Sequence, residues 1–236
     1  MKKVTEMSRL VEERKRCRLC GDLKNPAEVD EGVFDSERIG PYTRWQGNLD
    51  ARLMVVGRDF APVERFRALS GWPGESIQTN LSLVRLLAEA GFTIAPPCSG
   101  SSDDQIFFTN AVLCLPSGSA MRTRVRQESF RNCGRRFLRR TIEVVQPRAV
   151  AALGMAALDT ILEAFERPRC AGSLSANMNE TVTPWKFRVE GEQGLEADER
   201  DGDSLGGTGG GGGGEGEPAA VHSGVQAKDR PGGGWL

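Results

Sequence analysis

Residues 107–118, FFTNAVLCLPSG, carry two kinds of chemistry within one short stretch. Residues 106–112 form an apolar run of β-branched and aromatic side chains, a pattern that predicts a buried strand. Asn110 is the one amide in this run, and a buried amide is costly unless it is hydrogen-bonded. We therefore expect Asn110 either to satisfy nearby backbone or to point at a ligand. Cys114, four residues further on, is a possible metal ligand.

Outward from this stretch, short apolar runs alternate with helical periodicities. Strands are expected at residues 52–56, 106–112 and 149–153, and helices at 80–90, 128–145 and 155–165. The order β, α, β, α, β, α predicts a three-layer α/β/α fold, in which helices cover both faces of a mainly parallel sheet. A further helix is expected at 4–16, and residues 22–50, which lack periodicity, are expected to cross the surface.

Asp59 follows the first of these strands within the segment Gly57-Arg58-Asp59-Phe60. In open α/β sheets, ligands bind beyond the carboxyl ends of the strands. Asp59 therefore stands where catalytic or binding groups are usual.

The composition is ordinary for a soluble protein, but the charge is unevenly distributed. Of the 236 residues, 39% are hydrophobic and 27% are charged. Lys and Arg outnumber Asp and Glu by 26 to 21 in residues 1–170, and the acidic residues lead by 11 to 5 in residues 171–236. No apolar run approaches the roughly 18 residues of a membrane span, and the N-terminus lacks the apolar stretch of a signal peptide. We expect a cytoplasmic monomer that does not associate with membranes.

The periodic pattern fails after residue 170. Residues 171–218 include the low-complexity run LGGTGGGGGGEGE, which cannot form a packed core and predicts a disordered insertion. Residues 219–236 regain some sequence character. We therefore divide the chain into an α/β domain at 1–170, the insertion, and a short C-terminal segment.

Four of the six cysteines suggest a metal site. Cys17 and Cys20 form a C-x-x-C pair, and Cys114 and Cys133 are distant singles, one after a strand and one within a helix. Four thiolates suit a structural zinc ion or a [4Fe-4S] cluster, and spacing alone does not separate the two. Buried free thiols are the alternative for the two singles.

A second cluster is basic. Between residues 121 and 148, only Glu128 and Glu143 offset nine arginines. These arginines are Arg122, Arg124, Arg126, Arg131, Arg135, Arg136, Arg139, Arg140 and Arg148. Such a potential favours a phosphate backbone as partner, and a solvated helix face is the alternative.

The segments VVGRD, FFTNAVLC, NCGRRFL and PRAVAALGMAAL together resemble the iron-sulfur members of the uracil-DNA glycosylase superfamily, from about residue 14 to residue 165. The resemblance implies a four-stranded central sheet, a base-excision repair activity on uracil-containing DNA, and a [4Fe-4S] cluster, with zinc as the alternative. It implies that Asp59 is the catalytic acid and that Asn110 reads the uracil edge. It further implies that Cys17, Cys20, Cys114 and Cys133 ligate the cluster.

Other roles follow from the same resemblance. The single histidine of the chain, His222, aligns with the closing catalytic histidine of the family, although it could match by chance. Phe60 stands where the family has proline after the acid and is a candidate for base binding, and Trp72 is a candidate for stacking on the base. From the basic cluster itself, Arg131, Arg135 and Arg139 are expected to contact the DNA backbone.

Two further hypotheses remain open at this stage. The first is a DNA-binding homologue that keeps its cluster but has lost catalysis, because its final motif departs from the family pattern. The second is a zinc-stapled nucleic-acid module that lacks the base pocket. A coloured protein would indicate a cluster, and release of uracil from DNA would indicate the enzyme.

Overall fold

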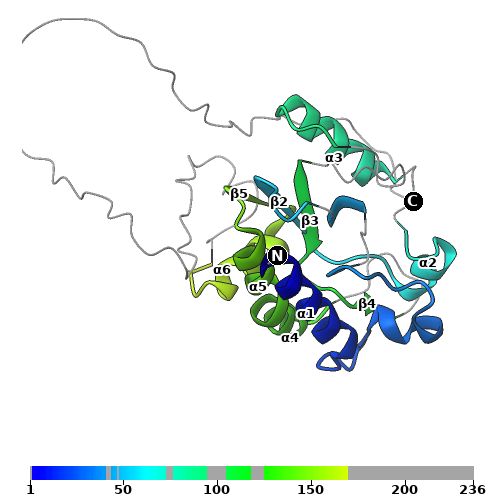
Figure 1. The fold of residues 1–236 in the computed structure, drawn as a ribbon. Helices are drawn as coiled ribbons and strands as arrows, with labels where there is room; N and C mark the ends of the chain where they lie inside the picture. Colours follow the sequence, from blue (N-terminus) through cyan, green and yellow to red (C-terminus); the bar gives the residue numbers. More distant parts are fainter. Residues whose placement is uncertain are drawn as a thin grey trace, which may run out of the picture. The chain divides into compact units, whose positions relative to one another are not determined.

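The computed structural model describes residues 2–40, 44–46, 48–72, 77–94, 105–117 and 125–169. Three parallel strands in the order β3-β2-β5 form the central sheet of this part of the chain (Figure 1). They are β2 (Leu53–Gly57), β3 (Ile106–Asn110) and β5 (Ala149–Ala152). The three predicted strands are therefore confirmed with small shifts at their ends. The described residues contain no fourth strand in this sheet, so the expectation of four is not met there.

Helices cover both faces of the sheet, as the alternating pattern predicts (Figure 1). Successive strand residues point to opposite faces. Met54 and Phe107 pack with one group of helices, whereas Val55 and Phe108 pack with the helix on the other face. The first group consists of α1 (Lys2–Arg16), α4 (Gln127–Cys133), α5 (Arg139–Val145) and α6 (Met155–Ala164). The opposite face is covered by α3 (Gln78–Glu89).

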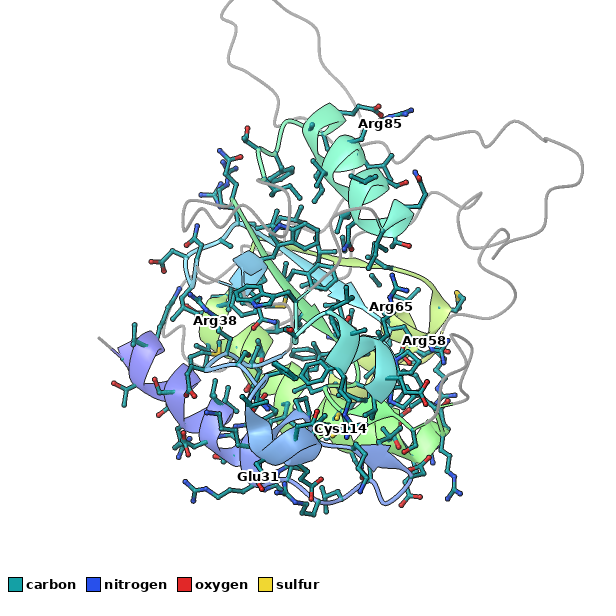
Figure 2. The ribbon with its side chains drawn as sticks, turned by 90° about the vertical axis from the view of Figure 1, so that its right-hand side faces the viewer. Glu31, Arg38, Arg58, Arg65, Arg85 and Cys114 are labelled. Atoms are coloured by element: carbon teal, nitrogen blue, oxygen red, sulfur yellow. The ribbon has the colours of Figure 1, made fainter. Side chains whose placement is uncertain are left out.

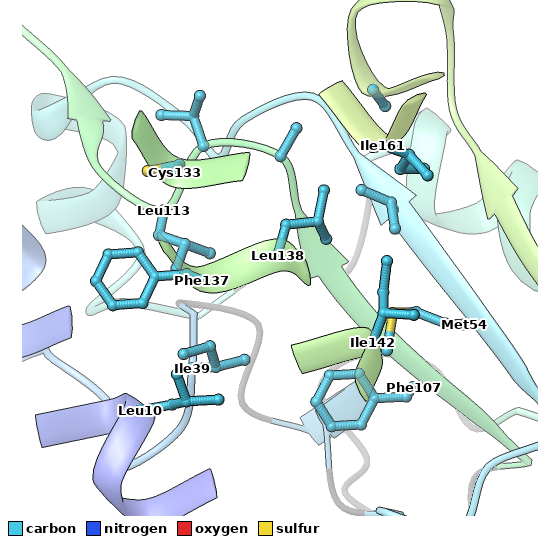
Figure 3. Packing of buried hydrophobic residues seen from close by; sticks show 14 of the residues in the cluster. Leu10, Ile39, Met54, Phe107, Leu113, Cys133, Phe137, Leu138, Ile142 and Ile161 are labelled. Carbon is cyan, nitrogen blue, oxygen red and sulfur yellow. The ribbon is translucent and has the colours of Figure 1, made fainter. Parts of the chain in front are cut away.

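The larger core lies between the sheet and the first group of helices (Figure 3). Met54 and Phe107 from the strands are joined there by Leu10 from α1. Phe137 and Ile142 come from the arginine-rich helix, residues 127–145, which includes α4 and α5. Each of these side chains is at most 2% exposed. Full burial of such a side chain contributes about 1.5–3 kcal/mol to the free energy of folding. The arginine-rich helix is therefore part of the core on one side.

The helix predicted at 128–145 is continuous but contains a π-helical turn, Gly134–Leu138, between α4 and α5. The backbone N–H of Arg139 bonds to the carbonyl of Gly134, five residues earlier. A Cβ atom at Gly134 would lie 2.8 Å from Cγ2 of Thr160, so a glycine lets α6 approach closely. Single π-helical turns occur often at functional sites, and this one directly follows Cys133.

The prediction that residues 22–50 only cross the surface is wrong. Trp45 and Ile39 are each 1% exposed, and the ring centroids of Trp45 and Phe108 are 5.5 Å apart. The segment also supplies β1 (Leu23–Lys24), which pairs antiparallel with β4 (Leu115–Pro116). Two short 3-10 helices complete it, η1 (Pro26–Gly32) and η2 (Arg44–Gln46).

Two other differences concern helices. A short helix, α2 (Val63–Ala68), follows β2 and was not predicted. The helix expected at 80–90 begins two residues earlier, after Ile77, and no side chain caps it. No helix in the described part of the chain combines the length and apolar character needed to cross a membrane.

Candidate active site and thiol cluster

Asn110 and Gly57 are paired opposite each other at the carboxyl ends of β3 and β2. The two strands stay together beyond this pair: the N–H of Ala111 donates to the carbonyl of Gly57 at 2.8 Å, and that of Val112 donates to the carbonyl of Arg58 at 3.0 Å. A Cβ atom on residue 57 would collide with Oδ1 of Asn110. Glycine therefore makes room for the asparagine side chain.

The Asn110 amide is buried and has no protein partner in the described part of the chain. The residue is 3% exposed. No hydrogen bond joins its side chain to another described residue, and neither amide atom is fully sealed from solvent. Because native proteins satisfy most buried polar groups, an amide in this state is available to a ligand. The second of the two sequence-based alternatives, a ligand-directed amide, fits this arrangement.

Asp59 lies two residues beyond the end of β2, where its side chain is 15% exposed. Burial raises the pKa of its carboxyl group above the usual value, and the charge of Arg58 partly opposes the increase. Nη2 of Arg58 is 3.7 Å from Oδ2 of Asp59, too far for a hydrogen bond. In Figure 2, Arg58 projects at the periphery beside α2. A partly buried carboxyl group with a perturbed pKa is typical of a functional site.

The two aromatic candidates lie in different surroundings. The Phe60 ring meets that of Phe66 edge-on, with 5.9 Å between the ring centroids, so it joins the small apolar cluster under α2. Trp72 is 41% exposed and follows Gly71, whose φ of +77° favours glycine. Phe60 is therefore held by packing next to Asp59, whereas Trp72 lies at the surface.

The four predicted metal ligands come together from three separate segments. Cys114 and Cys133 are buried, and Cys17 and Cys20 pack against the same core while remaining half-buried. Burial, followed by the charges of the other three cysteines, raises the pKa of the Cys114 thiol. Burial likewise raises the pKa of Cys133 to about 12, and a hydrogen bond from the backbone of Leu113 opposes this. These mutual effects show that the four thiols lie within electrostatic reach of one another.

Four cysteine sulfur atoms are a donor set that suits either a zinc ion or a [4Fe-4S] cluster. As the side chains stand in the described residues, no group of three or more His, Cys, Asp or Glu could hold a metal ion. A tetrahedral zinc site, with Zn–S bonds of about 2.3 Å, requires its sulfur atoms within about 3.8 Å of one another. A [4Fe-4S] cluster binds each cysteine to a different iron and so spreads the sulfur atoms further apart.

Asn25 organises the segment that carries the C-x-x-C pair. Its side-chain Nδ2 donates to the carbonyl of Arg14 at 2.6 Å and to that of Cys17 at 3.0 Å, and its Oδ1 accepts from the N–H of Ala27 at 3.1 Å. Its side chain is 1% exposed. One amide thus joins the end of α1, the first cysteine and the start of η1.

A pocket of about 210 Å³ lies beside this segment, lined by side chains that include Cys20, Asp22, Arg126 and Asn132. Nε of Arg126 is 3.4 Å from Oδ2 of Asp22 across it. The pocket lies beside Cys20, the second cysteine of the pair.

Several arginines of the basic helix are already paired with acidic side chains. Arg140 donates to both carboxylate oxygens of Glu13 in α1 at 2.6 and 3.0 Å. Nε of Arg131 lies 2.8 Å from Oε1 of Glu163 in α6, and Nε of Arg139 lies 2.8 Å from Oε1 of Glu143. Arg135 is exposed and has no ion pair in the described part of the chain. The helix is therefore less free to bind phosphate than its sequence suggests.

A profile of the Uracil DNA glycosylase superfamily matches residues 45–197, which is more than half of the chain. The chain belongs to the uracil DNA glycosylase superfamily. It is also 35% identical over 130 residues to the type-5 uracil-DNA glycosylase of Pyrobaculum aerophilum. That match covers 52% of this chain and 53% of the relative, so the chain spans about half of the curated relative's length.

The superfamily match contains Asp59, Asn110 and two of the four clustered cysteines, whereas Cys17 and Cys20 precede it. His222 lies after the match, and His222, Cys98 and Cys170 all lie outside the described residues. The structure thus places Asp59 and Asn110 at the carboxyl ends of the neighbouring strands β2 and β3, and the four cysteines in a second group.

The roles of three residues of these sites were not predicted from the sequence. The position of Gly57 opposite Asn110 follows only from the register of β2 and β3. Asn25 and Arg14 lie in segments with no distinctive motif, and their roles depend on contacts with residues up to 24 positions away.

Proposed function

We propose that this member of the uracil DNA glycosylase superfamily removes uracil from DNA by hydrolysing the N-glycosidic bond. The observation that carries this proposal is the juxtaposition of a partly buried acid, Asp59, with an unpaired buried amide, Asn110, at neighbouring strand ends. The similarity to a type-5 uracil-DNA glycosylase supports the same activity.

Asn110 would recognise the base. Its amide offers both a donor and an acceptor, which match the imide edge of uracil, and it meets the amino group of cytosine less well. Gly57 leaves the amide room beside the strand end. Because the amide forms no bond within the described protein, base binding would not have to break one first.

Asp59 would act on the sugar. As the bond to uracil breaks, the base becomes an anion and the sugar becomes cationic, so a carboxylate near the sugar stabilises charge that develops only in the transition state. Alternatively, the carboxylate orients the attacking water. A partly buried carboxylate interacts more strongly with such charge than one in bulk water, because the local dielectric is lower.

The base must leave the duplex before either residue can reach it. Contacts with phosphates hold the distorted backbone, and the exposed Arg135 is best suited to them because no carboxylate in the described part of the chain occupies it. Arg131 and Arg139 could contribute by exchanging their partly buried carboxylate partners, Glu163 and Glu143, for phosphate. Phe60 and Trp72 are the proposed aromatic contacts of the base.

The four thiols support the further proposal of a [4Fe-4S] cluster held by Cys17, Cys20, Cys114 and Cys133. When bound, the cluster would join the N-terminal segment to the loop between β3 and β4, which carries Cys114, and to α4, which carries Cys133. The proposed hydrolysis requires no electron transfer.

The C-terminal segment enters the proposal through His222, which would stabilise the leaving uracil anion. Residues 171–218 would then form an insertion before this closing motif. Activity of the His222→Ala variant, and of a chain ending at residue 170, tests this part separately. Full activity in both would remove the tail from the mechanism.

The direct test of the function is incubation of the purified protein with an oligonucleotide containing one uracil, followed by alkaline cleavage. Cleavage at the uracil position is expected, and the thymine-containing oligonucleotide is the matched control. A protein that binds the DNA and holds iron but yields no cleavage would instead be a catalytically impaired homologue.

A further inference from the structure

Arg14, in the last turn of α1, carries a charge that the proposed reaction does not use, and its side chain is only 1% exposed. Nη1 donates to both carboxylate oxygens of Asp35, at 2.6 and 2.8 Å. Nη2 donates to the backbone carbonyls of Ser36 and Arg38, at 2.8 and 3.1 Å. Burial of such a pair is costly and is tolerated only with good geometry and satisfied hydrogen bonds. These four contacts fix the plane of the guanidinium group.

The Nε–H of Arg14 is the exception. It is buried and has no acceptor in the described part of the chain. A buried donor without a partner typically costs about 1–3 kcal/mol. The other two nitrogens hold the Arg14 side chain in place. The Nε–H is therefore available to an acceptor outside the polypeptide.

Arg14 is three residues before Cys17, the first of the four cysteines. Its backbone carbonyl accepts a hydrogen bond from the N–H of Cys17 at 3.1 Å, and Asn25 bonds to the carbonyls of both residues. Arg14 also lies within electrostatic range of Cys114. Cysteine ligands bind as thiolates, so the assembled site gathers negative charge beside this one buried cation.

We propose that Arg14 is a positioning residue for the iron-sulfur cluster: its Nε–H donates to a sulfur atom of the cluster or of a cysteine ligand, and its charge balances the thiolates. The inference rests on the proposed cluster. Hydrogen bonds to the sulfur atoms and nearby charge both set the reduction potential of such clusters. Partners behind the ligands also govern how tightly a metal site is held.

The first test compares the double variant Arg14→Gln, Asp35→Asn with wild-type protein reconstituted with iron and sulfide. Replacing both partners avoids leaving Asp35 buried without a counter-ion. The cluster of the double variant should bleach roughly tenfold faster in the presence of a chelator, and its midpoint potential should be lower. The Asp35→Asn single variant, which keeps the Arg14 charge and its Nε–H, should retain iron and should not show the lower potential.

The second test uses a signature that a merely structural role would not give. In protein labelled with nitrogen-15 arginine, pulsed electron paramagnetic resonance of the reduced cluster should detect coupling to an arginine nitrogen. This coupling should be lost in the Arg14→Lys variant, which keeps a cation but has no Nε.

The outcomes distinguish a failure of the proposed cluster from a failure of the proposed role of Arg14. A wild-type protein that takes up no iron on reconstitution would refute the cluster and this inference together. A stable cluster that shows no arginine coupling, and that keeps its potential and its bleaching rate in the folded double variant, would refute the role of Arg14 alone. Circular dichroism of each variant establishes that it is folded.

Discussion

Oδ1 of Asn110 occupies the space that a Cβ atom of residue 57 would fill, so Gly57 and Asn110 are matched across the β2–β3 pairing. This match places an amide at the end of β3 beside the chain that leads from β2 to Asp59. The glycine is thus required by the close approach of a side chain, because its φ is not in the left-handed region.

The Gly57→Ala variant tests this relationship. The added methyl group would collide with Asn110 and lie 3.2 Å from Cζ of Phe108. Such overpacking typically costs about 1–3 kcal/mol in the free energy of unfolding, which denaturant titration measures. The double variant Gly57→Ala, Asn110→Ala should recover part of this loss, because the collision with Oδ1 is removed. Equal stability of Gly57→Ala and wild type would contradict the packing described for this edge.

The pKa of Asp59 predicts opposite effects on stability and activity. Because burial raises the pKa in the folded state, Asp59 favours folding at pH values below its ordinary pKa, and this contribution is lost as the pH rises through the folded value. At neutral pH, Asp59→Asn should therefore be at least as stable as wild type, and the difference should shrink in acid. Unfolding titrations of both proteins across this pH range measure the effect.

The same shift sets the pH dependence of the reaction. If the carboxylate form of Asp59 is needed, the single-turnover rate of uracil release should fall on acidification at a higher pH than an ordinary aspartate, whose pKa is about 3.9, would give. A rate that is constant through this range would show that Asp59 is not the titrating group. DNA binding measured in parallel separates the chemical step from association.

The cysteines give a prediction with an internal control. Each of Cys17→Ser, Cys20→Ser, Cys114→Ser and Cys133→Ser should lower the iron content and bleach the protein. Cys98→Ser and Cys170→Ser should leave both unchanged. Iron analysis and visible absorbance after anaerobic purification measure the result. Stoichiometric zinc with no iron in the wild type would show that the site belongs to a different metal.

Arg135 should contribute to DNA binding through phosphate contact. The Arg135→Ala variant should weaken binding to all sequences alike and reduce the slope of log affinity against log salt by about one. The matched control is Arg85→Ala, which removes an exposed arginine from α3 on the other face of the sheet. An unchanged slope for Arg135→Ala would assign Arg135 to a solvated helix face.

Much of the fold follows from sequence, because buried parallel strands are apolar runs and helices on a sheet keep a clear period. The burial of Trp45 and Ile39 was not predicted, because single buried residues in irregular segments produce no periodic pattern. The π-helical turn after Cys133 was not predicted either, because buried positions through it, such as Cys133, Phe137, Thr141 and Val145, keep the four-residue spacing of an ordinary α-helix.

The electrostatics were less predictable than the fold. Counting charges along residues 121–148 suggested a largely unpaired basic helix, but Arg140 pairs with Glu13, which is 127 residues away, and Arg131 pairs with Glu163. Such partners become neighbours only through tertiary packing. The same is true of Arg14 and Asp35, because no local sequence motif indicates that they pair.

The most direct test of the account compares release of free uracil from a uracil-containing duplex by the wild type and by Asp59→Asn, with enzyme in excess over DNA. Wild-type protein should release uracil, and Asp59→Asn should bind the same DNA but release it about a hundredfold or more slowly, as loss of one group that stabilises the transition state typically does. Equal rates for the two proteins would contradict the catalytic role of Asp59, and no release by wild-type protein that binds the duplex would contradict the proposed activity.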